Sequence, residues 1–266
     1  MDLLHAVALG FIQGVAEWLP ISSSAENILF MVGFLDFSPQ AAFSFSVYLH
    51  FGTLLAALAR FRRELLAAAK EFIDTGRSRL VFFIFTATVF SAFTGFPTYL
   101  FLKSSFLEYN GLFVMAFIGM LLVATGLVLY VSRKRAGWKT LEKSSWLEPT
   151  LAGLAQGIAA LPGISRSGLT LAVMLLRGFR QEDALRLTFI ISIPAVLGLI
   201  LVETISGGFI ALDYGAVVIG VGVSFVVGYL TIDLLIRLAG KVRFDFFCVL
   251  LGFFAVAAAV IQLLLK

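Results

Sequence analysis

One stretch decides how this chain folds, and it reads Pro162-Gly163-Ile164-Ser165-Arg166-Ser167-Gly168-Leu169-Thr170. It places a guanidinium group, three hydroxyl groups and two glycines between uncharged, mostly apolar segments, Leu151–Leu161 and Leu169–Leu176. An arginine surrounded by lipid costs at least ~2.5–3.5 kcal/mol, so we expect Arg166 to face a polar cavity and to act there. Glycines let the backbone approach a ligand, hydroxyl and amide groups at a helix start bind anions, and a guanidinium presents a bidentate fork to phosphate oxygens. The stretch therefore predicts a phosphate site; the alternative is a serine-rich turn whose arginine pairs with a glutamate.

Composition places the chain in a membrane. Its 266 residues are 60% hydrophobic and only 14% charged, with a mean hydropathy of +1.01, which excludes a soluble domain and indicates a multi-pass membrane protein. The single cysteine, Cys248, excludes a disulfide within one chain, and the two histidines, His5 and His50, exclude a histidine-rich metal cluster. The start Met1-Asp2 lacks the basic segment of a signal peptide, so we expect none. The net charge of +4 does not indicate a nucleic-acid partner, because the basic residues flank apolar segments.

Six apolar stretches are long enough to cross a hydrocarbon core of ~30 Å as helices. They are Ala41–Ala59, Leu80–Leu102, Gly111–Val131, Ala184–Val202, Tyr214–Ile236 and Phe244–Leu265. Two further apolar regions are broken: Leu3–Leu35 by Pro20 and the serines that follow, and Leu151–Leu176 by Pro162 and Gly163. The helix before Pro162 would rise only ~17 Å, about half of the core, so we expect this region to enter, turn and leave by the same side. Such a dip must be buried in protein or line a wet cavity, and two dips would have to meet.

The basic residues support this topology. If the loops after the first and third spans, the ends of the second broken region and the loop before the sixth span are cytoplasmic, only Lys103, Arg166 and Lys266 of the 20 basic residues lie elsewhere. The positive-inside rule then requires residues 151–176 to begin and end on the cytoplasmic side. The same rule places Asp36–Gln40 outside, so the first broken region is expected to dip from the outside. A membrane-spanning helix over Leu3–Leu19 is the alternative.

A sequence repeat relates the two broken regions. At a constant offset of 143, six residues of the first match six of the second: Gly10, Gln13, Gly14, Ile21, Ser22 and Ser24 correspond to Gly153, Gln156, Gly157, Ile164, Ser165 and Ser167. Each half then holds one re-entrant helix pair and three transmembrane helices, and three is odd, so the halves have opposite orientations. We therefore expect an all-α integral membrane protein built as an inverted repeat whose broken helices meet near the midplane and form the site. The predicted parts are residues 1–132 (re-entrant pair 3–35), a cytoplasmic linker 133–149, and residues 150–266 (re-entrant pair 151–176).

If the two breaks meet, polar residues of the first face polar residues of the second. The catalytic candidates are Glu17, Ser22, Ser23, Glu26 and Arg166, and the substrate-binding candidates are Gln13, Ser24, Asn27, Gly163, Ser165, Ser167 and Thr170. A carboxylate beside an arginine and a row of hydroxyls is unlike an anion pore and indicates phosphate chemistry. Glu17, with Glu26, either binds a divalent cation or activates a nucleophile, which is a serine hydroxyl or water. The alternative is a buried Glu17–Arg166 pair that only locks the halves together. His50 is expected to pack or cap rather than to bind a ligand.

Two motifs resemble the signatures of the undecaprenyl-diphosphatase family of the bacitracin-resistance type. They are Gln13-Gly14-Val15-Ala16-Glu17-Trp18-Leu19-Pro20-Ile21-Ser22-Ser23-Ser24 and the stretch Pro162–Thr170, and the segment Ser192–Ala195 is also similar to that family. The resemblance implies a phosphatase of the cell membrane that removes the terminal phosphate from a polyprenyl diphosphate and so recycles a lipid carrier for cell-wall or glycan assembly. It also implies dependence on Mg²⁺ or Ca²⁺ and a site open to the outer face. By the family pattern Glu17 is the acidic catalytic residue, Ser22 and Ser23 supply hydroxyls, and Ser165, Arg166 and Thr170 hold the diphosphate.

The chain departs from this family pattern after the serine triplet. Members usually have Gly-His there, and this chain has Ala25-Glu26. Either Glu26 replaces the histidine as base or metal ligand, or the protein mainly binds or moves its lipid. A non-hydrolytic transporter or flippase of a lipid phosphate, which an inverted repeat also suits, is therefore the second hypothesis. The expected partners are the polyprenyl diphosphate and the bilayer, and a homo-oligomer is left open.

Overall fold

Helices form the whole architecture. The computed structural model describes residues 2–106, 108–132, 137–208, 213–239 and 243–264, and within these ranges the chain has ten α-helices. Six are long and apolar enough to cross a membrane, which confirms the six predicted spans. They are α3 (Pro39–Thr75), α4 (Arg79–Phe101), α5 (Gly111–Ser132), α8 (Gln181–Ile205), α9 (Tyr214–Ala239) and α10 (Phe244–Leu264). Five of the basic residues used to predict the topology lie outside the described residues: Arg133, Lys134, Arg135, Lys241 and Lys266.

The two broken regions form two pairs of short helices. The first pair is α1 (Leu3–Ala16) and α2 (Ser23–Phe34), and the second is α6 (Leu147–Ile158) and α7 (Arg166–Leu176). The serine that follows each break caps the second helix of its pair. Ser22 accepts a hydrogen bond from the amide of Ala25 (3.4 Å), and Ser165 accepts one from the amide of Gly168 (3.0 Å).

The turn before α7 needs its glycine. Gly163 has φ of +102°, a conformation that residues with a side chain rarely adopt. Its carbonyl oxygen accepts a hydrogen bond from Thr125 of α5 (3.0 Å), which fixes the turn against that helix. The Pro-Gly break predicted from the sequence is therefore a defined turn.

Helix α3 is longer than the predicted span. The apolar stretch ends near Ala59, but the helix continues to Thr75 and ends at Gly76, whose φ is +70°. The extension contains no glycine or proline and is rich in Arg, Glu, Leu, Ala and Lys, which favour helix. Hydropathy marks where the apolar span stops, and the helix continues because its residues still favour that conformation.

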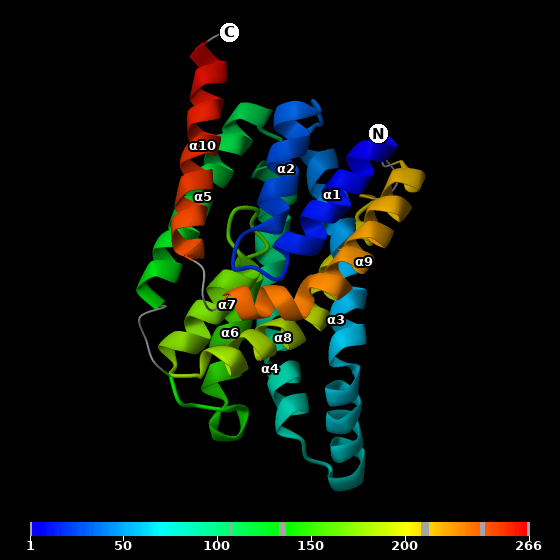
Figure 1. The fold of residues 1–266 in the computed structure, drawn as a ribbon, viewed down its shortest axis with the longest axis vertical. Coiled ribbons are helices and arrows are strands. Elements are labelled where there is room, and N and C mark those ends of the chain that lie inside the picture. The colour runs from blue at the N-terminus through cyan, green and yellow to red at the C-terminus, as the bar shows by residue number, and fades with distance from the viewer. Residues whose placement is uncertain (1, 107, 133–136, 209–212, 240–242, 265–266) are drawn as a thin grey trace.

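Glycines let the short helices pack closely on the long ones. Gly153 and Gly157 of α6 lie against the backbone of α4, and Gly10 and Gly14 of α1 lie against the backbone of α9. Figure 1 shows α1 beside α9 and α5 beside α10. Small residues at such crossings are typical of helix packing in membranes.

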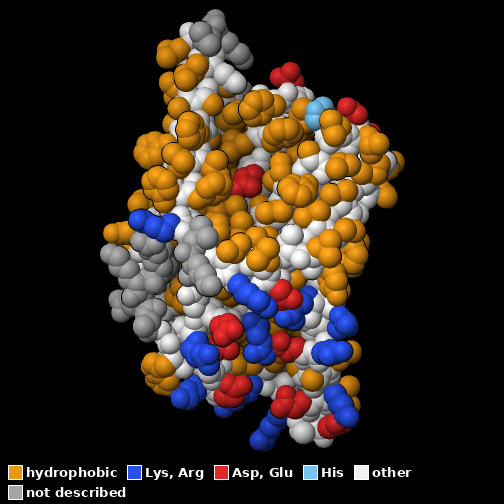
Figure 2. Space-filling view, viewed as in Figure 1, with side chains coloured by type: hydrophobic (Ala, Val, Ile, Leu, Met, Phe, Trp, Pro, Cys, Tyr) orange, Lys and Arg blue, Asp and Glu red, His pale blue; other side chains and the backbone are white. Residues whose placement is uncertain are grey.

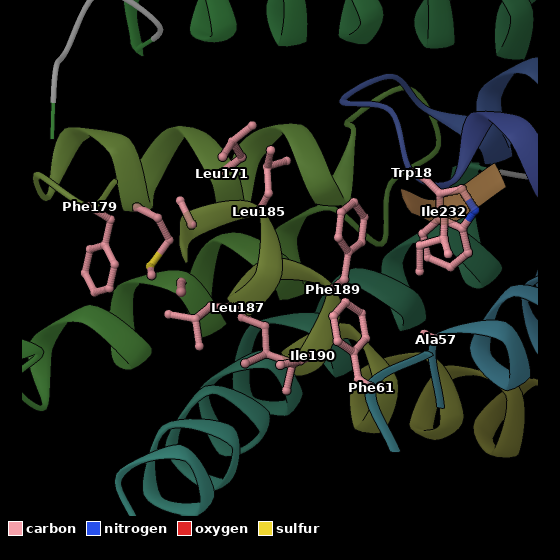
Figure 3. Close-up of a cluster of buried hydrophobic side chains, with 14 of the residues drawn as sticks. Trp18, Ala57, Phe61, Leu171, Phe179, Leu185, Leu187, Phe189, Ile190 and Ile232 are labelled. Atoms are coloured by element: carbon pink, nitrogen blue, oxygen red, sulfur yellow. The ribbon is translucent and has the colours of Figure 1, made fainter. Parts of the chain in front are cut away.

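A buried cluster holds the first break in place. Trp18, at the end of α1, packs edge-on against Phe189 of α8, with ring centroids 5.3 Å apart (Figure 3). Its indole nitrogen donates a hydrogen bond to the carbonyl of Gly228 on α9 (3.0 Å). Trp18 thereby anchors the first break to α8 and α9.

Charged side chains gather at one end of the molecule. On the face in Figure 2 hydrophobic side chains cover most of the surface, and Lys, Arg, Asp and Glu collect where α3 meets α4. The beginning of α1 and the end of α10 lie at the opposite end (Figure 1). An apolar belt with one strongly charged end is what a multi-pass membrane protein presents.

Candidate active site

The two breaks contact each other, as the sequence predicts. The amide of Gly163 donates to Ser22 Oγ (3.2 Å), and Ser165 Oγ donates to the carbonyl of Ile21 (2.9 Å). Ser167 Oγ donates to the carbonyl of Leu19 (2.8 Å). Three hydrogen bonds thus join loops that lie more than 140 residues apart in the chain.

Glu17 is the centre of the polar cluster at this junction. It is 9% exposed, and its Oε1 forms an ion pair with the guanidinium of Arg166. Its Oε2 accepts hydrogen bonds from Gln13 Nε2 (2.9 Å) and Ser23 Oγ (2.8 Å) and lies 3.3 Å from His50 Nε2. Both carboxylate oxygens therefore have partners, and the negative charge is compensated by a guanidinium 149 residues away in the sequence.

A cavity of about 240 Å³ opens from this cluster. Its polar end includes Glu17, the three serines after Pro20, His50 and Arg166. Its other end is apolar and lies between α3, α4 and α8, where it is lined by residues such as Phe43, Val47, Phe96, Leu199 and Val202. A ligand that fits both ends has a polar head and an apolar tail.

Comparisons with known proteins show the family of the chain. The family described as "Bacitracin resistance protein BacA" matches residues 6–257. The chain belongs to the BacA family. An undecaprenyl-diphosphatase of Methanothrix thermoacetophila is 40% identical over 257 residues, which cover 97% of each chain. Those of Methanococcoides burtonii and Methanopyrus kandleri are 38% and 37% identical, over 96% and 95% of this chain and 98% and 94% of their own.

In this BacA-family chain ten of the twelve predicted site residues fall into two groups. Six line the cavity: Glu17, Ser22, Ser23, Ser24, Arg166 and Ser167. Four others are buried beside it and hold the cluster together: Gln13, Asn27, Gly163 and Ser165. Asn27 donates to Gln13 Oε1 (3.0 Å), and Gln13 in turn donates to Glu17.

The structure does not bring Glu26 and Thr170 into the cavity. Neither lines it, and Glu26 Oε1 and Thr170 Oγ1 are buried without a hydrogen-bond partner among the described residues. Ser23 and Asn27, one helical turn apart on α2, form the face that points toward α1. Glu26 precedes Asn27 by one residue, which is about 100° of rotation around the helix axis. Because Glu26 does not line the cavity, the geometry does not assign it the role of the motif histidine.

His50 is the residue that sequence reasoning missed. We expected it to pack or cap, but it lines the cavity, with Nε2 3.3 Å from Glu17 Oε2 and 3.5 Å from Ser24 Oγ. The signal was present, because His50 is an ionisable residue inside an apolar span, where such residues are functional candidates by default. Gln156 and Ser91 also line the cavity and are hydrogen-bonded to each other (2.8 Å).

The donor set suits a cation that is bound mainly by its ligand. Among the described residues there is no group of three or more His, Cys, Asp or Glu side chains that could hold a metal. Glu17 is the one carboxylate of the described residues that lines the cavity. Mg²⁺ is commonly held by one or two carboxylates together with substrate phosphates, so a single carboxylate fits that arrangement.

Proposed function

We propose that the chain hydrolyses undecaprenyl diphosphate to undecaprenyl phosphate and inorganic phosphate at the junction of the two breaks. One observation carries the proposal: Glu17 and Arg166 contact each other at the polar end of a cavity whose other end is apolar. The relatives of the chain, which are undecaprenyl-diphosphatases, support the same activity. The product would be the lipid carrier in the form that can be loaded again.

Arg166 is proposed to hold the diphosphate. Arg166 is the first residue of α7, and its guanidinium offers a fork of N–H donors that matches phosphate oxygens. The charge that develops on the phosphoryl oxygens during transfer would be stabilised by this preorganised group. The apolar lining between α3, α4 and α8 would hold the first part of the prenyl chain.

Glu17 is proposed to orient the groups around the phosphate. It pairs with Arg166 and accepts the hydrogen bond of Ser23, and so fixes both side chains beside the cavity. Glu17 is also the carboxylate that would hold Mg²⁺ or Ca²⁺ together with the diphosphate. Such an ion, when bound, supplies positive charge that neutralises the phosphate oxygens.

The architecture is proposed to be an inverted repeat, residues 1–132 and 150–266 joined by residues 133–149. Its support is reciprocal packing: α1 of the first half lies on α9 of the second, and α6 of the second half lies on α4 of the first. The glycines at the two crossings, Gly10 and Gly14 on α1 and Gly153 and Gly157 on α6, occupy matched positions of the sequence repeat. Two helix pairs that exchange partners in this way are what the repeat predicts.

The site is proposed to open to the outer face. With the charged end in the cytoplasm, α3 runs inward and α4 and α8 run outward. The cavity residues Phe43 and Val47 then lie in the outer part of α3, and Phe96 and Val202 lie in the outer parts of α4 and α8. The cavity would therefore extend from the level of the two breaks toward the outer leaflet.

Phosphate release tests the proposed activity. Purified protein in detergent is incubated with undecaprenyl diphosphate and Mg²⁺, and inorganic phosphate is measured; undecaprenyl phosphate serves as the control substrate. We expect one phosphate per diphosphate and none from the monophosphate. Tight binding of the diphosphate without release would instead support a lipid-phosphate transporter.

A further inference from the structure

We propose that His50 is the catalytic base of this site, and that it takes the proton from the oxygen that attacks the terminal phosphorus. The proposal rests on the phosphatase activity proposed above and assigns His50 a role in that reaction. The position of the imidazole ring is the first evidence. His50 lies on α3, well away in sequence from both breaks, and its ring is buried at the polar end of the cavity.

The ring is held in one orientation by its other nitrogen. Nδ1 lies 2.7 Å from the carbonyl oxygen of Ser46, one helical turn earlier on α3. A carbonyl oxygen only accepts hydrogen bonds, so Nδ1 carries the hydrogen and the neutral ring presents an unprotonated Nε2 to the cavity. Sites that activate a hydroxyl nucleophile typically contain a base that a third group holds in one orientation.

The groups that face Nε2 suit proton transfer. Ser24 Oγ lies 3.5 Å away, a reach that is commonly loose before the substrate binds, and Glu17 Oε2 lies 3.3 Å away. Glu17 would stabilise the imidazolium that forms when Nε2 takes a proton. The charged groups around the ring are Glu17, from the first break, and Arg166, from α7.

Glu17 is less suited to be the base itself. One of its oxygens is paired with Arg166, and the other already accepts hydrogen bonds from Gln13 and Ser23. Each of these donors stabilises the ionised carboxylate and makes it a weaker base. Glu17 then positions Arg166 and Ser23, and His50 accepts the proton.

The chemical step balances without a further reactant. The attacking hydroxyl group gives its proton to His50 Nε2, and its oxygen bonds to the terminal phosphorus. The bond between that phosphorus and the bridging oxygen breaks, and undecaprenyl phosphate leaves with the electron pair. The hydroxyl group belongs to Ser24, in which case water later hydrolyses the phosphoserine with the same base, or to water directly. The proton returns to the solvent or leaves with the phosphate.

The test compares His50→Gln with His5→Gln, since His5 is the other histidine of the chain and does not line the cavity. His50→Gln should lower kcat by at least ~100-fold and leave KM within a few-fold. His5→Gln should match the wild type in both respects.

Two further variants make the outcome specific. In folded His50→Ala, added imidazole is expected to restore part of the phosphate release, which loss of a packing residue alone would not allow. Ser24→Ala combined with His50→Gln distinguishes the attacking group: a loss no larger than that of either single variant assigns it to Ser24, and full activity of Ser24→Ala assigns it to water.

Three results separate the possible failures. His50→Gln with a wild-type kcat overturns the role of His50 while the phosphatase activity stands. Absence of rescue in folded His50→Ala also overturns it. A wild-type protein that releases no phosphate from undecaprenyl diphosphate overturns the proposed function, and the role of His50 with it.

Discussion

The backbone amide of Gly163 donates a hydrogen bond of 3.2 Å to the hydroxyl oxygen of Ser22. The same oxygen accepts a hydrogen bond from the amide of Ala25 at the start of α2. One hydroxyl group therefore caps a helix of the first break and holds the second break against it. This junction brings Glu17 into contact with Arg166, the ion pair on which the proposed function is based.

Arg166→Lys is expected to lower kcat/KM for phosphate release by at least ~100-fold, because an ammonium is a point charge and does not replace a bidentate fork. The control is Arg180→Lys, since Arg180 is exposed and its ion pairs within the described part of the chain are with Glu182 and Asp183, close to it in the sequence. We expect the control to keep wild-type kinetics. Near-normal turnover of Arg166→Lys would contradict a direct contact between Arg166 and the phosphate.

Gly153→Val tests the close packing of α6 on α4. A Cβ atom on Gly153 would clash with the backbone carbonyl of Ala87, and overpacking of this kind costs about 1–3 kcal/mol. We expect the melting temperature in detergent to fall by at least about 4 °C. Gly222→Val is the matched control, because a Cβ there has no neighbour within 4 Å. Equal melting temperatures for the two variants would contradict the crossing.

Glu148 gives the fold a pH dependence outside the six spans. Burial raises the pKa of its carboxyl, but hydrogen bonds from Lys139, Ser145 and Arg177 outweigh burial and lower the pKa from 4.5 to about 2. A depressed pKa contributes stability above pH 4.5, and this contribution is lost as the pH falls from 4.5 toward 2.

We therefore expect Glu148→Gln to melt below the wild type at about pH 7, and the difference to shrink at about pH 3. Thermal unfolding in detergent at the two pH values measures it. Glu182→Gln, at a side chain that is 85% exposed, should show no difference at either pH. A gap between wild type and Glu148→Gln that stays constant with pH would mean that the carboxylate contributes only through packing.

Much of the fold could be predicted from the sequence because hydropathy and helix breakers act locally. The six spans and both breaks follow from apolar stretches and from Pro20 and Pro162, and the contact between the breaks follows from the need to bury irregular backbone. The extension of α3 beyond Ala59 was missed because a charged segment can leave the membrane and remain helical.

The site was only partly readable because the rotation of a helix about its axis is set by its neighbours. Asn27 faces Gln13, and Glu26, the next residue back, does not line the cavity. The sequence alone did not show which of these two residues faces the site. His50 reaches the site because α3 packs beside the first break, and neither motif of the sequence contains that information.

The most direct measurement is phosphate release from undecaprenyl diphosphate by the wild type and Glu17→Gln, side by side, with and without Mg²⁺. The amide of the variant has the shape of the carboxylate, so we expect the fold to be retained. It cannot compensate the charge of Arg166, so we expect the activity to be lost. The proposal predicts that the wild type releases phosphate and that Glu17→Gln, still monodisperse, is slower by at least ~100-fold. Hydrolysis by Glu17→Gln at the wild-type rate would contradict it and would reduce the Glu17–Arg166 pair to a structural contact between the two breaks.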